Sequence, residues 1–256
     1  GKEIAVNSAY EKSKLLDFLN DDAFGRDITA SITPQFHATA TIKCNENCVL
    51  SGLEEAHFLF SSNALKVKML AKNGSRINKG KIIMKITGSN RKILSAERVC
   101  LNVIGKMSGI ATICATAAEI AGGRKGLVAG KTKIYLTRKT TPGFSVFEKK
   151  ASIDGRVNPH RKNLADGVLL KENHLVFFDS IRTAVKAAKK KYKNKKIEIE
   201  VENEGGAVEA AKADAGIILL DNFSVAKAKG AIKKIKKRNK RIVVELSGGI
   251  GLKNLK

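Results

Sequence analysis

Short apolar runs alternate with amphipathic stretches through the second half of the chain. The runs with the length and flanking turns of buried strands are 133–137, 167–171, 197–201, 216–220 and 242–246. Between them, apolar residues recur at helical spacing over 179–192, 204–213 and 224–237. Because strands that alternate with helices are joined by crossovers, this pattern predicts parallel strands with helices packed outside them.

The first half of the chain has a different pattern. After an amphipathic stretch at 9–20, which predicts a helix, strand-like runs follow at 39–43, 49–52 and 67–70. Turn signals at Asn73-Gly74 and Lys79-Gly80 separate these runs from later apolar positions. The pattern predicts a small β-rich or α+β domain that precedes the strand–helix repeat.

A long helix is predicted between the two patterns. Leu101, Ile104, Met107 and Ile110 recur at helical spacing within residues 95–118. Ser95 is the expected N-cap, because an acidic residue follows it within the first turn. Gly105 and Gly109 lie four residues apart and are expected to allow close helix packing.

Composition adds a strongly basic charge to this picture. The 256 residues include 48 Lys and Arg but only 24 Asp and Glu, which gives a net charge of +24. The densest lysine runs, 186–196 and 233–241, fall where helices are predicted to end, and cations are favoured there. We therefore interpret the charge as solvated helix ends. Nucleic-acid binding is not expected, because no aromatic residues interleave with the lysines.

The cysteines and the chain start give no sign of secretion. Cysteines stand at 44, 48, 100 and 114, without the second pair that a zinc site needs. Cys100 and Cys114 fall in apolar helical stretches and are expected to be buried. No signal peptide and no membrane span are expected, so we predict a cytoplasmic protein.

Cations and histidines are concentrated within one short region. The segments TRKTTPGF (137–144), Pro159-His160-Arg161 and LLKENHL (169–175) contribute Arg138, Lys139, His160, Arg161, Lys171 and His174. Clustered fixed cations favour a pocket for a multiply charged anion, such as a phosphate or a dicarboxylate. His174 also has a simpler interpretation, as a structural histidine beside the end of the Lys171 strand.

Polar residues follow the predicted strands at their carboxyl ends, where active sites of α/β barrels lie. They are Arg138 and Lys139, Lys171, Glu200 and Glu202, Asp221, and Ser247-Gly248-Gly249. Glu198 shares a strand face with Glu200 and Glu202, so periodicity alone does not choose among the three glutamates. The recurrence at successive strands favours a functional site over solvated loops.

These motifs resemble the quinolinate phosphoribosyltransferase family, the carboxylating nicotinate-nucleotide pyrophosphorylases. The matching segments are GRDIT (25–29), ERVCLNVIGKMSGIAT (97–112), TRKTTPGF (137–144), PHRKNLADGVLLKENH (159–174), IEIEVEN (197–203), ILLDNF (218–223) and ELSGGI (245–250). The resemblance covers almost the whole chain. It implies an α/β fold, with an N-terminal α/β sandwich domain and helical connector at 1–112. An open, incomplete (β/α) barrel would follow at 113–256.

The resemblance also implies an activity and its partners. The family transfers a phosphoribosyl group from phosphoribosyl diphosphate to quinolinate with decarboxylation, which yields nicotinate mononucleotide, diphosphate and carbon dioxide for NAD biosynthesis. It uses Mg²⁺, and it works as a homodimer in which each active site is shared between subunits. The chain is thus expected to be a pentosyltransferase with these two small-molecule substrates.

Residue roles carry over from the family motifs. Quinolinate would be bound by Arg98 of the other subunit and by Arg138, Lys139, His160, Arg161 and Lys171. Catalytic residues would be Lys139, Lys171, Glu200 and Asp221, and Glu200 and Asp221 would also face magnesium. Ser247, Gly248 and Gly249 would hold the 5′-phosphate, as Gly-rich turns expose backbone N–H groups to phosphate.

Three departures from the family accompany the resemblance. Gly155-Arg156-Val157-Asn158 replaces a glycine-rich run, Leu136 replaces an aspartate, and the sequence ends at Lys256 where the family continues with another strand. Weaker binding of phosphoribosyl diphosphate than of quinolinate is therefore expected. Two alternatives stay open: a molybdenum-operon protein of the same fold with another substrate, and a basic nucleic-acid-binding protein on an inactive barrel.

Overall fold

The computed structural model describes residues 8–23, 27–122 and 132–255. Over these residues the chain divides into two compact units, the first ending at His160 and the second running from Arg161 to Leu255. Each unit has its own hydrophobic core. Gly25 and Arg26 of the GRDIT segment lie outside the described residues.

An antiparallel sheet in the order β1–β5–β3 forms one layer of the first unit. Along β1 (His37–Lys43), Ala38, Ala40 and Ile42 alternate with exposed residues and pack on the core. β5 (Ile82–Ser89) is the central strand between β1 and β3 (Lys66–Met69). A second antiparallel pair joins β2 (Cys48–Val49) to β4 (Arg76–Ile77). Both predicted turns, Asn73-Gly74 and Lys79-Gly80, are turns in the structure.

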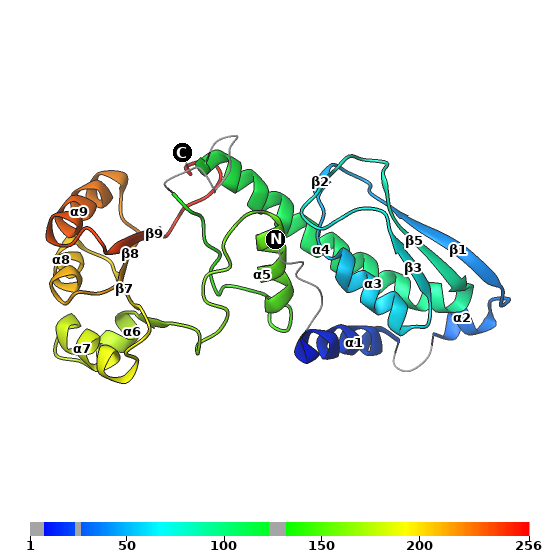
Figure 1. Cartoon of the computed structure of the whole chain (residues 1–256), viewed down its shortest axis with the longest axis horizontal. Helices are drawn as coiled ribbons and strands as arrows, with labels where there is room; N and C mark the ends of the chain where they lie inside the picture. Colours follow the sequence, from blue (N-terminus) through cyan, green and yellow to red (C-terminus); the bar gives the residue numbers. More distant parts are fainter. Residues whose placement is uncertain (1–7, 24–26, 123–131, 256) are drawn as a thin grey trace. The chain divides into compact units, whose positions relative to one another are not determined.

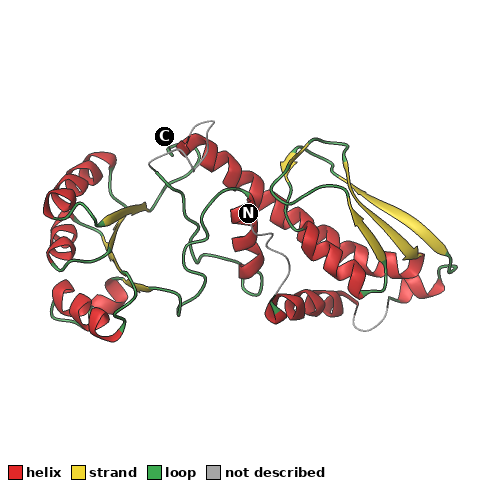
Figure 2. Cartoon of the chain, viewed as in Figure 1, coloured by secondary structure: helices red, strands yellow, loops and turns green. Residues whose placement is uncertain are grey.

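The helices of the first unit pack around α4, a helix of 33 residues (Asn90–Gly122). They are α1 (Ala9–Ala23), α2 (Ile28–Ile32), α3 (Leu53–Ser62) and α5 (Ser145–Asp154). Side chains of α3, α4, α5 and the sheet share one core, and Figure 2 shows α3 and α4 running beside the strands. Cys100 and Cys114 are buried along α4, as predicted.

Length and hydropathy alone would also allow α4 to cross a membrane. An 18-residue window of the helix reaches a mean hydropathy of 1.4, but half of that window is buried inside the protein. Core helices of soluble proteins pass the same test, so this is weak evidence for a span. The buried stripe of α4 packs on α1, α2, α3, α5 and strands of the first unit.

Two details of the helix prediction are wrong. α4 begins at Asn90, directly after β5, and the Asn90 side chain accepts from Phe36 N and donates to Pro34 O. Ser95 therefore lies inside the helix and donates to Arg91 O instead of capping it. Gly105 and Gly109 do not mediate close packing, because no atom lies within 4 Å of a Cβ built at either position. Glycines outside the helix approach α4 closely instead, at Gly52 and at Gly155.

The second unit is a parallel sheet in the order β6–β7–β8–β9 with helices between the strands. The strands are β6 (Val168–Leu170), β7 (Ile197–Val201), β8 (Ile217–Asp221) and β9 (Val243–Ser247). The helices are α6 (Glu172–Leu175), α7 (Ile181–Lys191), α8 (Glu204–Lys212) and α9 (Val225–Arg238). In Figure 1, α7, α8 and α9 lie on the same side of these strands. The predicted strand–helix alternation is confirmed for this unit.

One predicted strand does not form. Residues 133–137 make only an isolated parallel bridge, between Tyr135 and Asn158, and this segment belongs to the first unit. The neighbouring α5 packs on α4 through Phe147 and Ala151, which draws residues 144–155 into the core of the first unit. The compact units therefore divide after His160, whereas the domain boundary expected at 112/113 stays a prediction.

We expect Gly155→Ala to destabilise the first unit. A Cβ at position 155 would overlap Ala111 O and lie 2.5 Å from Cys114 Cβ, both on α4. Overpacking of this kind lowers the free energy of unfolding by about 1–3 kcal/mol. Gly109→Ala on the same helix is the control, because its Cβ meets open space and should be neutral or stabilising. Urea unfolding of both variants checks this, and equal midpoints would contradict it.

Candidate active site

The parallel sheet of the second unit has one apolar face and one polar face. Val201, Ile199, Ile218 and Leu220 point to the core shared with α8 and α9. Their neighbours in the strands therefore point the other way, since successive side chains alternate. The polar side chains on this second face, called the polar face below, are Glu198 and Glu200 of β7, Asp221 of β8, and Glu245 and Ser247 of β9; the apolar Ile217, Leu219 and Val243 share the face with them. In-register pairing places Asp221 beside Ser247.

Lys171 and Glu200 form an ion pair at the carboxyl ends of β6 and β7. Lys171 Nζ donates to Glu200 Oε2 at 2.5 Å, and the Glu200 side chain is only 10% exposed. A charge-assisted hydrogen bond in such a half-buried place fixes both side chains. The structure thus brings together two residues that the sequence predicted as catalytic.

Asp221 and the turn after β9 form a second polar contact. Ser247 Oγ donates to Asp221 Oδ1 at 2.5 Å, and Asn222 Nδ2 donates to Asp221 Oδ2 at 2.7 Å. Asn222 N also donates to Ser247 O at 3.0 Å, which joins the two strand ends. Gly248 and Gly249 follow with φ of 83° and 65°, in the left-handed region that favours glycine. The predicted phosphate-binding turn therefore lies directly beside a predicted metal ligand.

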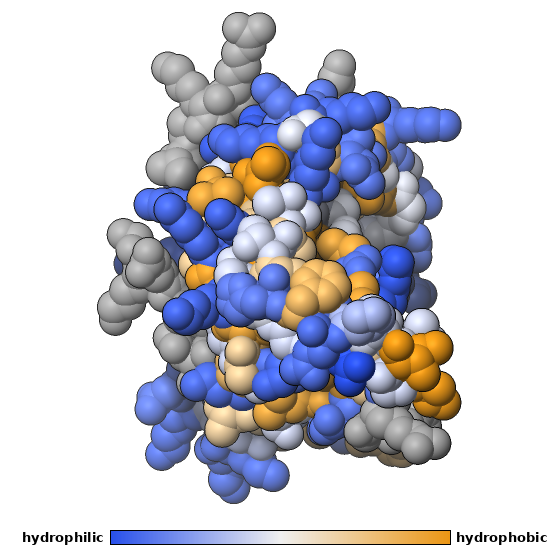
Figure 3. Space-filling view, turned by 90° about the vertical axis from the view of Figure 1, so that its right-hand side faces the viewer, coloured by the Kyte–Doolittle hydropathy of each residue, from blue (hydrophilic) through white to orange (hydrophobic). Residues whose placement is uncertain are grey.

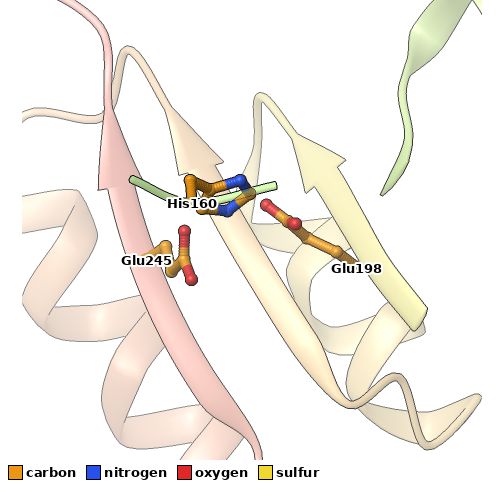
Figure 4. A group of neighbouring side chains, drawn as sticks. All are labelled: His160, Glu198 and Glu245. Carbon is orange, nitrogen blue, oxygen red and sulfur yellow. The ribbon is translucent and has the colours of Figure 1, made fainter. Parts of the chain in front are cut away.

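Sequence reasoning missed Glu245 on the same face. A carboxylate oxygen of Glu245 and one of Glu198 lie within 4.8 Å of each other, and Figure 4 shows the two side chains reaching across β8. His160, which Figure 4 also labels, belongs to the first unit. Strand periodicity could have identified Glu245, because it stands two residues before Ser247 and so shares its strand face.

The remaining predicted cations are divided between the two units. Arg138 and Lys139 follow the Tyr135–Asn158 bridge in the first unit and are exposed, and His160 ends that unit. Arg161 opens the second unit, where its Nη1 donates to Gly167 O at 3.4 Å. Each unit thus carries some of the side chains that were predicted to bind the anion. Their convergence on one anion stays a prediction.

Arg98 and His174 have different surroundings. Arg98 is exposed on α4, so its side chain is accessible to another molecule. His174 Nδ1 instead accepts from Lys171 N at 3.2 Å. This bond fixes the chain just after β6, so the structural interpretation of His174 is supported.

The cysteines are not suited to metal binding or nucleophilic attack. Burial raises the pKa of the Cys100 thiol to about 12 and that of the Cys114 thiol to about 11. Burial, and next the neighbouring Cys44, raise the pKa of Cys48 to about 11. Because a thiolate is the reactive form, these thiols are inert at neutral pH.

The polar face offers hard oxygen donors of the kind that Mg²⁺ prefers. Glu200 and Asp221 present carboxylates at the ends of adjacent parallel strands, and Glu198 and Glu245 lie one pleat further along the same face. Magnesium is held by one or two carboxylates together with substrate phosphates. The donor set therefore fits a magnesium ion.

A parallel α/β sheet with carboxylates and a Gly-rich turn at its strand ends, preceded by an α/β unit, defines an α/β enzyme that acts on a charged, phosphorylated small molecule. The family models agree with this class. The N-terminal domain of quinolinate phosphoribosyl transferase matches residues 27–108, and its C-terminal domain matches residues 110–256. The chain belongs to the quinolinate phosphoribosyl transferase family, which confirms the resemblance seen in the sequence.

Individual relatives are similar over most of their length. A probable carboxylating nicotinate-nucleotide pyrophosphorylase of Archaeoglobus fulgidus is 36% identical over 231 residues, 90% of this chain and 86% of the relative. NadC from Streptococcus pyogenes superposes with a TM-score of 0.88 at 31% identity, covering 100% of this chain and 88% of that one. The nicotinate-nucleotide pyrophosphorylase of Francisella tularensis gives 0.88 at 30% identity, with coverages of 99% and 89%. The predicted fold class is confirmed.

We expect Gly248→Ala to disrupt the turn after β9. A Cβ at Gly248 would overlap the Asn222 side chain and lie 2.7 Å from Asn222 N, and φ of 83° is strained for alanine. The left-handed conformation alone costs about 1–2 kcal/mol for an L-residue. Gly251→Ala is the control, because its Cβ meets open space. Thermal unfolding should separate the variants, and an unchanged Gly248→Ala midpoint would contradict the turn geometry.

Proposed function

We propose that the chain transfers the phosphoribosyl group of phosphoribosyl diphosphate to the ring nitrogen of quinolinate, with loss of diphosphate and carbon dioxide. The product is nicotinate mononucleotide, a precursor in NAD biosynthesis. The observation that carries this proposal is the match of both family domains over nearly the whole chain. The polar face of the second unit supports it with the groups that such a reaction needs.

The cationic residues are proposed to bind quinolinate. This substrate is a dianion, and guanidinium forks suit planar carboxylates. Arg138, Lys139, His160, Arg161 and Lys171 would hold its two carboxylates, with Lys139 and Lys171 acting in catalysis. Lys171 is already oriented by Glu200, so its ammonium group is held at the edge of the sheet. Fixed cations of this kind offset the substrate charge without rearrangement during the reaction.

The acidic residues are proposed to act at the sugar. The ribosyl carbon becomes cationic as diphosphate leaves, and nearby carboxylates stabilise that charge. Glu200 and Asp221 occupy this role, and their oxygens would also hold Mg²⁺, which neutralises the leaving diphosphate when bound. Ser247, Gly248 and Gly249 would bind the 5′-phosphate through their backbone N–H groups.

A homodimer with a shared active site is proposed from the surface of the first unit. Ile28 and Ile32 of α2 and the nearby Phe36 are 67%, 81% and 59% exposed, which is unusual for a group of large apolar side chains. The space-filling view in Figure 3 has apolar patches within a mainly hydrophilic face. Arg98 would reach the active site of the other subunit. The enzyme would work in the cytoplasm.

Product formation tests the proposed function. The protein is incubated with quinolinate, phosphoribosyl diphosphate and magnesium, and nicotinate mononucleotide and carbon dioxide are measured together. Stoichiometric appearance of both products supports the proposal. The proposal would be refuted if the folded protein forms neither product and calorimetry shows that it binds neither substrate. Nicotinate in place of quinolinate is the specificity control, because it lacks the carboxylate that is lost.

We expect Arg161→Ala to raise the KM for quinolinate. Loss of one charge-assisted contact of about 1.5–3 kcal/mol corresponds to roughly a 10- to 150-fold increase. Arg182→Ala is the matched control, because Arg182 is exposed on α7. Steady-state kinetics with both substrates varied checks this, and equal KM values for the two variants would remove Arg161 from the site.

Arg98→Ala and Lys171→Ala should complement each other when mixed. If Arg98 serves the other subunit, a heterodimer has one site with both defects and one intact site. Random exchange of equal amounts should then restore about a quarter of the wild-type activity, because half of the dimers are mixed. Activity after subunit exchange, demonstrated with labelled chains, checks this. No recovery would mean that Arg98 does not act across a dimer interface.

A further inference from the structure

α5 carries a buried lysine that contacts two separate segments of the first unit. Lys149 is 5% exposed, and its Nζ donates to the backbone carbonyls of Pro159 and of Thr137, the latter at 3.5 Å. A buried ammonium group must be surrounded by acceptors, since its desolvation is otherwise very unfavourable. The two carbonyls therefore determine where this side chain can lie, and the side chain in turn ties them to α5.

Both carbonyls immediately precede residues of the candidate site. Thr137 comes before Arg138 and Lys139, and Pro159 comes before His160. His160 has φ of 53°, a left-handed conformation that is uncommon for a residue with a side chain. The carbonyl held by Lys149 belongs to the peptide group that leads into this strained residue. A contact at this point can set the direction of the His160 side chain.

Lys149 adds side-chain hydrogen bonds next to the backbone pairing of these two segments. The two segments pair through Leu136 N to Asn158 O at 2.8 Å and Asn158 N to Ile134 O at 3.0 Å. Within the described residues, the regular pairing of the two segments is limited to this bridge between Tyr135 and Asn158. The ammonium group has three donors and reaches the carbonyls of Thr137 and Pro159 just beyond the last paired residues.

We propose that Lys149 is a positioning residue for the quinolinate-binding side chains. It holds one backbone carbonyl on each of the two segments and so fixes the spacing and direction of Arg138, Lys139 and His160. This inference rests on the proposed function for its substrate, but the contacts themselves do not depend on it. The neighbouring Glu148 also helps to fix the loop that carries Arg138 and Lys139, because its carboxylate accepts from Thr141 N at 3.2 Å.

The next residue offers a matched control. Lys150 is also buried on α5, at 8% exposed, but it pairs with Glu55 of α3 and does not contact either segment in the described contacts. Lys150→Met removes a buried charge from the same helix and leaves Glu55 without its partner, which destabilises the fold. Lys149→Met removes a buried charge as well. A purely structural effect would therefore appear in both variants.

Kinetics of the full chain test the proposal. Lys149→Met should raise the KM for quinolinate by about 10- to 100-fold, the effect expected of a misplaced binding group, and change that for phosphoribosyl diphosphate less than about threefold. Lys149→Gln keeps an N–H donor and should recover part of the affinity, and it replaces Lys149→Met if that variant does not fold. Lys150→Met should lower the melting temperature and leave both KM values unchanged. Unchanged quinolinate KM in folded Lys149 variants, or equal changes in both KM values, overturns the proposal.

Hydrogen exchange separates this test from that of the proposed function. In the absence of ligand, Lys149→Met should accelerate amide exchange in peptides covering 133–141 and 156–161, whereas Lys150→Met should not do so selectively. If the wild-type protein forms no product from quinolinate, the proposed function fails, and the exchange result alone decides whether Lys149 holds the two segments. Unaltered exchange in both segments overturns the proposal whatever the activity.

Discussion

The apolar core on one face of the parallel sheet is the constraint on which the second unit depends. Helices α8 and α9 cover Ile199, Val201, Ile218 and Leu220, so every residue between them in the strands must point to the opposite face. That face can then carry charges without disturbing the core. Its carboxylates and Ser247 are consequently held by rigid strands, which orient functional groups more precisely than loops do. The position of these polar side chains on one face of the sheet therefore follows from the two-residue period of the strands.

The candidate site segments of the first unit are not strands, so they are held in place by other contacts. The chain that leads into residues 137–144 is joined to residues 158–160 by one bridge, between Tyr135 and Asn158, and both segments are supported by side chains of α4 and α5. Lys106 of α4 donates to Thr141 Oγ1 at 3.0 Å, while Glu148 and Lys149 of α5 hold backbone groups on both segments. Buried charges in a core are usually unfavourable. Here Glu148 and Lys149 hold backbone groups of segments that a regular ladder does not join.

Much of the fold could be predicted from the sequence, and the failures have physical causes. Four strands and three helices of the second unit appear where periodicity placed them, because local pattern and burial agree there. The strand expected at 133–137 failed because its apolar residues pack on α4 and pair with Asn158 instead of joining the sheet. Ser95 looked like a cap, but β5 leads directly into α4. Glu245 could have been predicted, because alternation along the strand places it on the same face as Ser247. The contacts of Lys149 depend on tertiary structure that periodicity does not encode.

The distribution of charge also separates the proposed function from a nucleic-acid-binding role. Six of the 48 Lys and Arg residues lie in the last turns of α7 and α9, as Lys189–Lys191 and Lys236–Arg238. Cations there are favoured by the helix dipole and do not require a partner. Two cations of the candidate site are instead held by specific partners, Lys171 by Glu200 and Arg161 by Gly167 O. Orientation of this kind is unnecessary for contact with a flexible phosphate backbone, which binds any accessible positive surface. It is what a small dianion requires, because both of its carboxylates must be met at fixed positions.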